Sequence, residues 1–200
     1  MNIGITGGTG CGKTTALNAI RELGGTVIDC DAVYHRLLQS DTALLRAIET
    51  RFPSTVEEGV LQRKKLGAIV FSDKNALADL NAITHAAITG EVKRLLKNTH
   101  GLAAIDAIAL FESGLCSLCD VTVAVTAPEE VRIARLMARD GISQEYAAVR
   151  IAAQKPQSWF SAHCDYTLVN DSTQADFHNK CLAFFSKLDI MKEKSKGEPL

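Results

Sequence analysis

Residues 7–15 read GGTGCGKTT, and the rest of the chain is organised around this stretch. From its first glycine to Thr14 it fills the pattern G-x-x-x-x-G-K-[ST], which is typical of a loop that binds the phosphates of a nucleotide. The short apolar run at residues 2–6 predicts a buried strand before the loop, and apolar residues at helical spacing over 15–23 predict a helix after it. Because strand, loop and helix occur in the required order, we prefer this interpretation to a glycine turn followed by a chance Lys-Thr pair.

The residue types in this loop suit a triphosphate. Glycines allow a tight turn and bring backbone N–H groups onto phosphate oxygens, and the following helix directs its positive end at the same anion. We expect Lys13 to reach the β- and γ-phosphates and the Thr14 hydroxyl to bind Mg²⁺. The residues predicted to hold the nucleotide are Gly8, Thr9, Gly10, Cys11, Gly12, Lys13, Thr14 and Thr15.

Length and composition restrict the class of protein. The chain has 200 residues, of which 46% are hydrophobic, and this suits one α/β domain with a helical insertion. Its net charge of −1 argues against a protein that binds nucleic acid by broad neutralisation of phosphates. No stretch approaches the about 18 uninterrupted apolar residues of a membrane span, and a predicted buried strand stands where a signal peptide would be. We therefore expect a cytoplasmic protein, either a monomer or a weak oligomer.

The six cysteines are expected to be reduced thiols. Cys116 and Cys119 form a C-x-x-C pair, but a zinc site would need two more ligands, and only His163 and Cys164 offer themselves. Unlinked thiols are the simpler interpretation. Cys11 differs because it lies inside the phosphate loop, so we expect an oxidant or alkylating reagent at this position to block nucleotide binding.

Two carboxylates follow the second predicted strand, residues 26–29. In open α/β sheets ligands bind at the carboxyl ends of the strands, which is where Asp29 and Asp31 are expected to lie. Asp31 could accept the proton of an attacking hydroxyl or help to hold the water shell of a metal ion. The alternative is an aspartate that caps the next helix, predicted over 32–38. Both roles are compatible if different carboxylates fill them.

Residues 41–98 lack the pattern of strands and carry several helical apolar stripes. A helical insertion of this size between strands is typical of a substrate-binding subdomain or a lid. The basic residues at 63–65 are expected either to face an anionic substrate or to form a solvated helix face. His85 lies in the middle of a predicted helix, where a structural histidine is the simpler interpretation.

Residues 102–106 read LAAID, in which a buried strand delivers Asp106 toward a metal ion, directly or through water. The apolar run continues through 107–111, so Asp106 lies either at the tip of this strand or within it. A further strand is predicted over 121–126. The helix after it begins at Pro128 and places three arginines on one face, at positions Arg132, Arg135 and Arg139.

Arginines on a shared helix face can bind phosphate oxygens in pairs. The alternative is a solvated basic face paired with Glu129 and Asp140. A second helix, 143–154, carries Arg150, and the two helices together resemble a lid that closes over the transferred phosphoryl group. The last predicted elements are a strand over 166–170, a helix over 176–188 and a polar, disordered tail over 191–200.

These elements predict a five-stranded parallel sheet with helices on both faces, in the architecture of phosphate-loop kinases. We expect one domain, with a core at 1–40, 99–127 and 157–190, a helical acceptor-binding insertion at about 41–98 and a helical lid at about 128–156.

The order of elements and several short motifs resemble the dephospho-coenzyme A kinase family. Residues 27–31 read VIDCD, which is similar to the family's VIDAD. Further similar stretches are LQR at 61–63, NAITH at 81–85, FE at 111–112, RLMARD at 135–140, RIAAQ at 150–154, Asp165 and VN at 169–170. The resemblance extends from Met1 to about Asn170.

The resemblance implies transfer of the γ-phosphoryl group of ATP, with Mg²⁺, to the ribose 3′-hydroxyl of dephospho-coenzyme A, the last step of coenzyme A synthesis. It implies that Lys13 and Arg139 act in catalysis with Asp31 as the base, and that Arg135 also binds the nucleotide. His85 and Glu112 would belong to the acceptor side with Asp31. Kinases for other small acceptors, such as a nucleoside or shikimate, remain an alternative. A nucleotide-dependent switch is disfavoured because the chain has no guanine-reading N-K-x-D motif.

Overall fold

The computed structural model describes the backbone of residues 1–196 and side chains through residue 188. Two compact units make up the chain. The first comprises Met1–Ile28, Thr99–Leu110 and the chain from Cys116 onward, and the second comprises Asp29–Asn98 and Phe111–Leu115. The prediction of one domain with an insertion and a lid stays a prediction.

A five-stranded parallel sheet forms the centre of the first unit, as the sequence predicts. Its strands follow the spatial order β2-β5-β1-β6-β7. They span Asn2–Thr6 (β1), Thr26–Asp29 (β2), Ala103–Asp106 (β5), Val121–Thr126 (β6) and Tyr166–Val169 (β7). The central strand β1 is paired on both sides, with Ile3 opposite Ala104 of β5 and Val121 of β6. Its carboxyl end leads directly into the glycine loop at residues 7–12.

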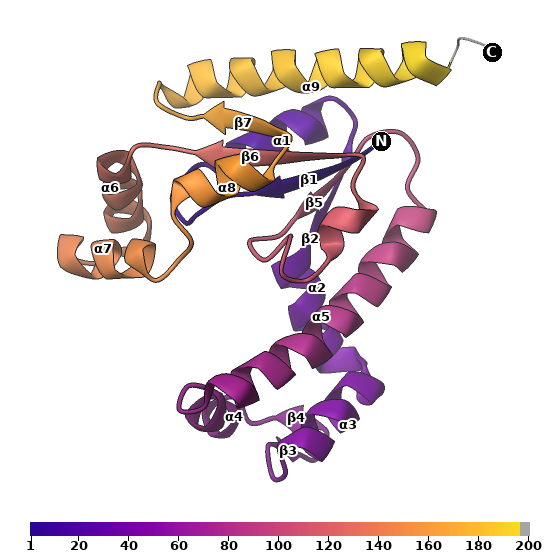
Figure 1. Ribbon diagram of the computed structural model, residues 1–200, viewed down its shortest axis with the longest axis vertical. Coiled ribbons are helices and arrows are strands. Elements are labelled where there is room, and N and C mark those ends of the chain that lie inside the picture. The colour runs from indigo at the N-terminus through magenta and orange to yellow at the C-terminus, as the bar shows by residue number, and fades with distance from the viewer. Residues whose placement is uncertain (197–200) are drawn as a thin grey trace. The chain divides into compact units, whose positions relative to one another are not determined.

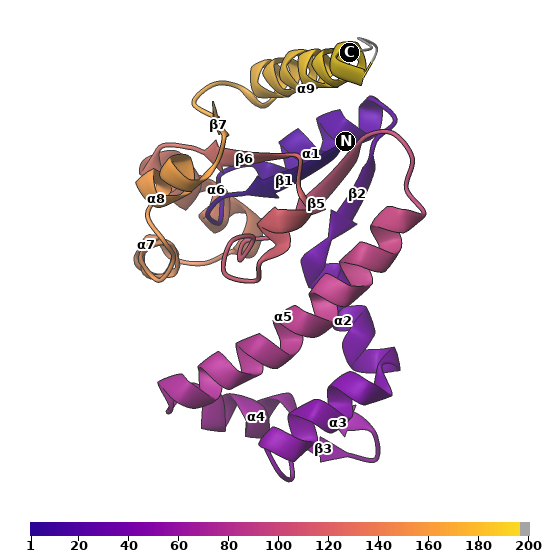
Figure 2. The ribbon, with the colours of Figure 1, turned by 45° about the vertical axis from the view of Figure 1, so that its right-hand side comes forward.

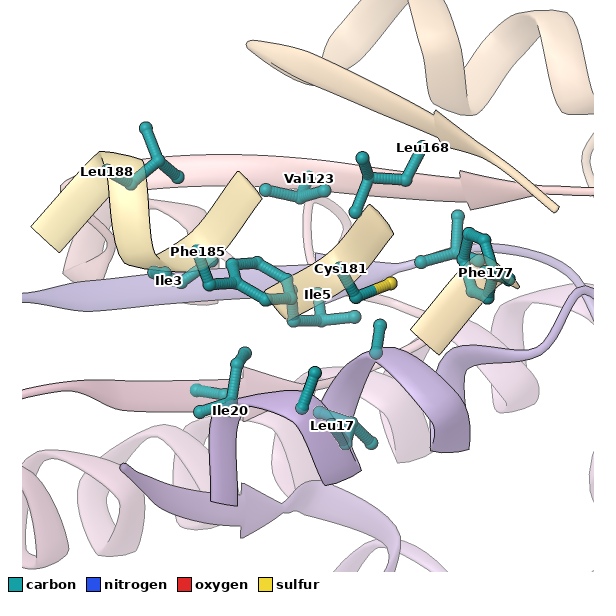
Figure 3. Packing of buried hydrophobic residues seen from close by; sticks show 14 of the residues in the cluster. Ile3, Ile5, Leu17, Ile20, Val123, Leu168, Phe177, Cys181, Phe185 and Leu188 are labelled. Carbon is teal, nitrogen blue, oxygen red and sulfur yellow. The ribbon is translucent and has the colours of Figure 1, made fainter. Parts of the chain in front are cut away.

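Helices α1 (Lys13–Glu22) and α9 (Gln174–Lys196) pack against each other and against one face of this sheet (Figure 1). Figure 3 shows the core between them: Ile3, Ile5, Val123 and Leu168 of the strands pack with Leu17 and Ile20 of α1 and with Phe177 and Phe185 of α9. Helix α8 (Gln157–His163), which the sequence analysis did not predict, contacts β6. α1 is followed by Gly24, which adopts a positive φ of 79° and donates its N–H to the carbonyl of Arg21.

Two short helices follow β6 and lie beside each other (Figure 1). α6 spans Glu129–Asp140 and ends at Gly141, and α7 spans Gln144–Ala152 and is capped by the Ser143 hydroxyl. They share a small apolar cluster of Leu136, Ala147 and Ile151. These are the two helices predicted to form the lid.

The second unit is mainly helical and contains the predicted insertion, 41–98, together with residues 29–40 and 111–115, which were predicted as core. Its long helix α5 (Lys74–Lys97) contacts the other three, and Figure 2 shows them around it: α2 (Cys30–Ser40), α3 (Thr42–Arg51) and α4 (Arg63–Val70). The prediction that no strand occurs here is wrong, because β3 (Val56–Glu57) pairs with β4 (Val60–Leu61). Strands of two residues are too short to show alternation. Their hairpin is held by the Glu49 carboxylate, which accepts bonds from the backbone of Ser54, Thr55 and Val56.

One further boundary differs from the prediction, and a second decides between two alternatives that the sequence leaves open. Helix α9 continues through Lys196, so the polar segment at 191–196 is helical and the expectation of disorder there is wrong; residues 197–200 lie outside the described part of the chain. β5 stops at Asp106, which therefore lies at the tip of the strand and not within it. Within the described residues, no helix is long and apolar enough to span a membrane.

Candidate functional site

The glycine loop between β1 and α1 has a positive φ at three of its glycines, a backbone conformation that favours glycine. Gly12, the residue before α1, has a φ of 96°. A Cβ at this position would lie 2.1 Å from the side-chain nitrogen of Asn170, so only glycine fits. The Lys13 ammonium donates to the carbonyl of Gly7 at 3.0 Å and thus lies across the loop. Thr14 occupies the first turn of α1 with an exposed side chain.

Asn170 directly follows β7, and its side chain bonds to the glycine loop and to Arg135. Its Nδ2 donates to the Cys11 carbonyl at 3.0 Å, and its Oδ1 accepts from Arg135 Nη2 at 3.1 Å. Arg135 Nη1 also donates to the Gly10 carbonyl at 3.3 Å. Asn170 is 2% exposed, and the sequence analysis did not give it a functional role. The signals in the sequence are a polar residue at the end of a predicted strand and the similar VN stretch at 169–170.

The three arginines of α6 have different environments, although they were predicted to share one face. Arg132 is 3% exposed, so a solvated basic face is wrong for this residue. Its Nε donates to the Thr9 carbonyl at 2.8 Å. Gln154, after α7, accepts from the Thr9 N–H at 2.8 Å. The two side chains therefore hold the peptide groups on both sides of Thr9, a role that the sequence analysis missed.

Arg139 is exposed and forms a two-point ion pair with Asp140, at 2.7 and 3.0 Å. Arg150 of α7 donates to the same carboxylate at 2.6 Å. Hydrogen bonds from both guanidinium groups lower the pKa of Asp140 to about 2. Arg139 thus has the acidic partner that the alternative interpretation expects, and its predicted role at the phosphates stays a prediction.

The predicted magnesium ligands are oxygen donors of the right kind. Asp106 lies opposite Ile5, the residue next to the last of β1, so its carboxylate belongs to the strand adjacent to the loop. The Thr14 hydroxyl is exposed at the start of α1. A hydroxyl and a carboxylate suit Mg²⁺, which prefers hard oxygen ligands and keeps several of its waters beside substrate phosphates. These two residues could therefore hold the ion together with a bound nucleotide.

Cys11 is buried within the loop, at 1% exposure. Burial raises the pKa of its thiol above the ordinary value, although the charges of Lys13 and Arg132 act in the opposite direction. A protonated, inaccessible thiol reacts slowly. A reagent therefore has poor access to Cys11 in the folded chain. All six cysteines are free thiols, as predicted.

In the second unit, Asp29 and Asp31 have separate roles. The Asp29 carboxylate accepts from the Ala32 N–H at 3.0 Å and caps α2. Asp31 lies in the first turn of the same helix with an exposed side chain. The capping alternative is therefore true of Asp29, and Asp31 stays available for chemistry.

His85 and Glu112 belong to the same unit, although 27 positions separate them in the sequence. Burial lowers the pKa of His85, and the charge of Glu112 acts in the opposite direction. The same unit contains a contact between α4 and α2 that the sequence analysis did not predict: Arg63 Nη2 lies 3.2 Å from His35 Nδ1. Arg63, one of the three basic residues at 63–65, therefore has a specific contact partner within the unit.

Known proteins similar to this chain point to one family. The family model described as dephospho-CoA kinase matches residues 1–176. A dephospho-CoA kinase of Anaeromyxobacter dehalogenans is 40% identical over 174 residues, 84% of this chain and 82% of the relative. A solved protein of Thermus thermophilus is 32% identical with a TM-score of 0.78, covering 94% of this chain and 97% of its own. The solved dephospho-CoA kinase from Campylobacter jejuni is 25% identical with a TM-score of 0.69, covering 96% and 98%.

Proposed function

This chain belongs to the dephospho-CoA kinase family and is a kinase, and we propose that it transfers the γ-phosphoryl group of ATP to the ribose 3′-hydroxyl of dephospho-CoA. The products would be ADP and coenzyme A. The observation that carries this proposal is the complete phosphate loop, with Lys13 across it, in a chain matched to the family over residues 1–176.

The first unit supplies the groups for the nucleotide. Little covalent chemistry is required of the protein in phosphoryl transfer, so positioning and charge neutralisation account for the rate. Lys13 would leave the Gly7 carbonyl for the β- and γ-phosphates. Thr14 and Asp106 would hold Mg²⁺, which neutralises charge on the phosphates. Arg135 is placed by Asn170 and by loop carbonyls, which supports its role in binding the nucleotide.

The second unit supplies the groups for the acceptor. We assign Asp31 as the base that takes the proton of the 3′-hydroxyl, because its neighbour Asp29 is the one engaged in capping. His85, kept neutral at pH 7 by burial, and Glu112 would bind the acceptor. Arg139 would exchange its Asp140 partner for a phosphate oxygen in the course of the reaction. The protein would act in the cytoplasm, as a monomer or weak oligomer.

The test measures ADP release with Mg·ATP and dephospho-CoA, adenosine, AMP or shikimate as acceptor. We expect release with dephospho-CoA alone and a product that carries one added phosphate at the 3′-position. Release with a different acceptor would overturn the assignment of the substrate and leave the nucleotide site intact.

Asp31→Asn and Asp29→Asn form a matched pair for the assignment of the base. Asp31→Asn should lower kcat at least about 100-fold with an unchanged Kd for ATP, since proton transfer typically contributes a factor of that size. Asp29→Asn should retain turnover, because asparagine also caps helices. Equal losses in both variants would contradict the assignment.

A further inference from the structure

Arg132 is a buried cation in the first unit. The side chain comes from α6, is 3% exposed and spends one donor, Nε, on the Thr9 carbonyl. Its Nη2 is buried and has no hydrogen-bond partner among the residues that the structure describes. Among the ion pairs of the described residues, none includes Arg132. The charged groups that act on it are the exposed carboxylate of Glu129 and the buried thiol of Cys11, which is neutral when protonated.

An uncompensated buried charge costs stability unless an opposite charge approaches it. Arginine does not escape this cost by losing its proton, because its pKa is far above neutral. The arrangement therefore calls for an anion, and the nearest segment of chain is a loop whose pattern binds phosphate.

The loop is shaped around this arginine. A Cβ on Gly8 would lie 2.5 Å from Arg132 Nη2, and a Cβ on Gly10 would lie 2.9 Å from the Arg132 carbonyl. Both glycines occupy positions at which the generic loop pattern accepts any residue. Their small size is thus explained by the approach of Arg132, with the positive φ of 76° as a further reason at Gly10.

The backbone of Thr9 is fixed on both sides of the residue. Arg132 Nε bonds to its carbonyl and Gln154 Oε1 bonds to its N–H, both at 2.8 Å. Both groups belong to the segment predicted as the lid. The loop conformation is therefore coupled to the position of α6 and of the residue that follows α7.

We propose that Arg132 is a positioning residue and counter-charge for the nucleotide: it fixes the Thr9 carbonyl and supplies a buried positive charge that bound phosphates compensate. This inference rests on the proposed use of ATP but not on the identity of the acceptor. It makes an unusual prediction. Loss of the charge should weaken binding of the triphosphate without lowering the stability of the nucleotide-free protein.

Three substitutions separate the charge from the hydrogen bond. Glutamine places its amide nitrogen where Arg132 has Nε, so Arg132→Gln keeps the bond to Thr9 and removes the charge. Arg132→Lys keeps the charge, and Arg132→Met removes both. Arg21→Gln, at an exposed position of α1, is the matched control for loss of one positive charge.

The measurements are the Kd of Mg·ATP and of adenosine by calorimetry, and the melting temperature with and without Mg·ATP. We expect Arg132→Gln to weaken ATP binding at least about tenfold, a loss of about 1.4 kcal/mol. Adenosine affinity should not change, because it carries no phosphate. The melting temperature without nucleotide should be equal or higher, and the increase on adding Mg·ATP should be smaller. Arg132→Lys should bind ATP nearly as well as the parent, and Arg21→Gln should behave as the parent throughout.

In turnover, KM for ATP should rise with KM for the acceptor unchanged. Parent-like ATP affinity in Arg132→Gln would overturn the proposal. So would a lower melting temperature without nucleotide combined with equal losses for ATP and adenosine, because that result indicates a structural role only. If Arg132→Met does not fold, the Gln and Lys variants still show whether the charge at this position supports ATP binding. ATP binding by the parent without turnover of dephospho-CoA would overturn the proposed acceptor and leave this test valid.

Discussion

Asn170 joins the end of β7 to the phosphate loop, and Asn170→Ala removes both of its side-chain bonds at once. The donor bond goes to the carbonyl of Cys11 at 3.0 Å, and the acceptor bond comes from Arg135 at 3.1 Å. Asn170 is 2% exposed, so water cannot easily replace the lost partners. The loop carbonyl would keep only the long contact from Arg135 Nη1, at 3.5 Å.

The expected cost follows from these two bonds. A buried carbonyl that loses its donor costs about 1–3 kcal/mol, and a bond to a charged group contributes about 1.5–3 kcal/mol. Arg135 is only half-buried and can turn to solvent, so the second figure is taken at its lower end. We expect Asn170→Ala to lose about 2.5–4.5 kcal/mol of unfolding free energy, or roughly 5–18 °C in melting temperature for a protein of this size. ATP affinity should fall as well, because the carbonyls of Gly10 and Cys11 and the Arg135 side chain all lose their anchor.

Urea unfolding measures the first quantity and calorimetric titration of Mg·ATP measures the second. Asn170→Asp is the informative companion: it keeps the acceptor for Arg135 but places a carboxylate oxygen against the Cys11 carbonyl, so it should bind ATP more weakly still. Asn179→Ala, on the exposed surface of α9, is the control. Unfolding free energy within about 0.5 kcal/mol of the parent, together with unchanged ATP affinity, would refute the reasoning, since surface changes typically fall in that range.

Three further predictions concern single residues. Gly12→Ala should abolish ATP binding and destabilise the protein by roughly 2 kcal/mol or more, because its Cβ would lie 2.1 Å from Asn170 Nδ2 on a backbone with positive φ; binding that survives would show that the loop can relax. His85 has a lowered pKa in the folded state because of burial, so the unfolded chain binds its proton more readily. The unfolding free energy should therefore fall as pH drops from about 6.5 through the lower folded pKa; urea titrations from pH 5 to 8 should show a smaller fall in His85→Gln, and an unchanged fall would exclude His85 as its source. Cys11 should resist iodoacetamide at pH 8 until the protein is unfolded in urea, as followed by peptide mass spectrometry, and rapid labelling of the native protein would contradict its burial.

The fold was largely predictable because its signals are local. Strand and helix periodicities, the glycine loop and the helix caps each occupy a few consecutive residues, and a parallel sheet follows from strands that alternate with helices. The elements that escaped prediction have weak local signals. The hairpin at β3 and β4 has two residues in each strand, and α8 is a single short helix of seven residues.

The sequence by itself determined the phosphate loop and the resemblance to one kinase family. The loop is a local feature because backbone N–H groups from consecutive residues surround the phosphates. Only the tertiary structure decided which contact each arginine of α6 makes. Arg132 is buried and bonds to the loop, Arg135 bonds to Asn170, and Arg139 pairs with Asp140. Helical spacing places the three on one side of a cylinder but does not say what packs against each turn. The groups that hold the loop, Arg132, Gln154 and Asn170, lie more than 120 residues away from it in sequence. Such contacts depend on where distant segments pack, and no local pattern encodes that.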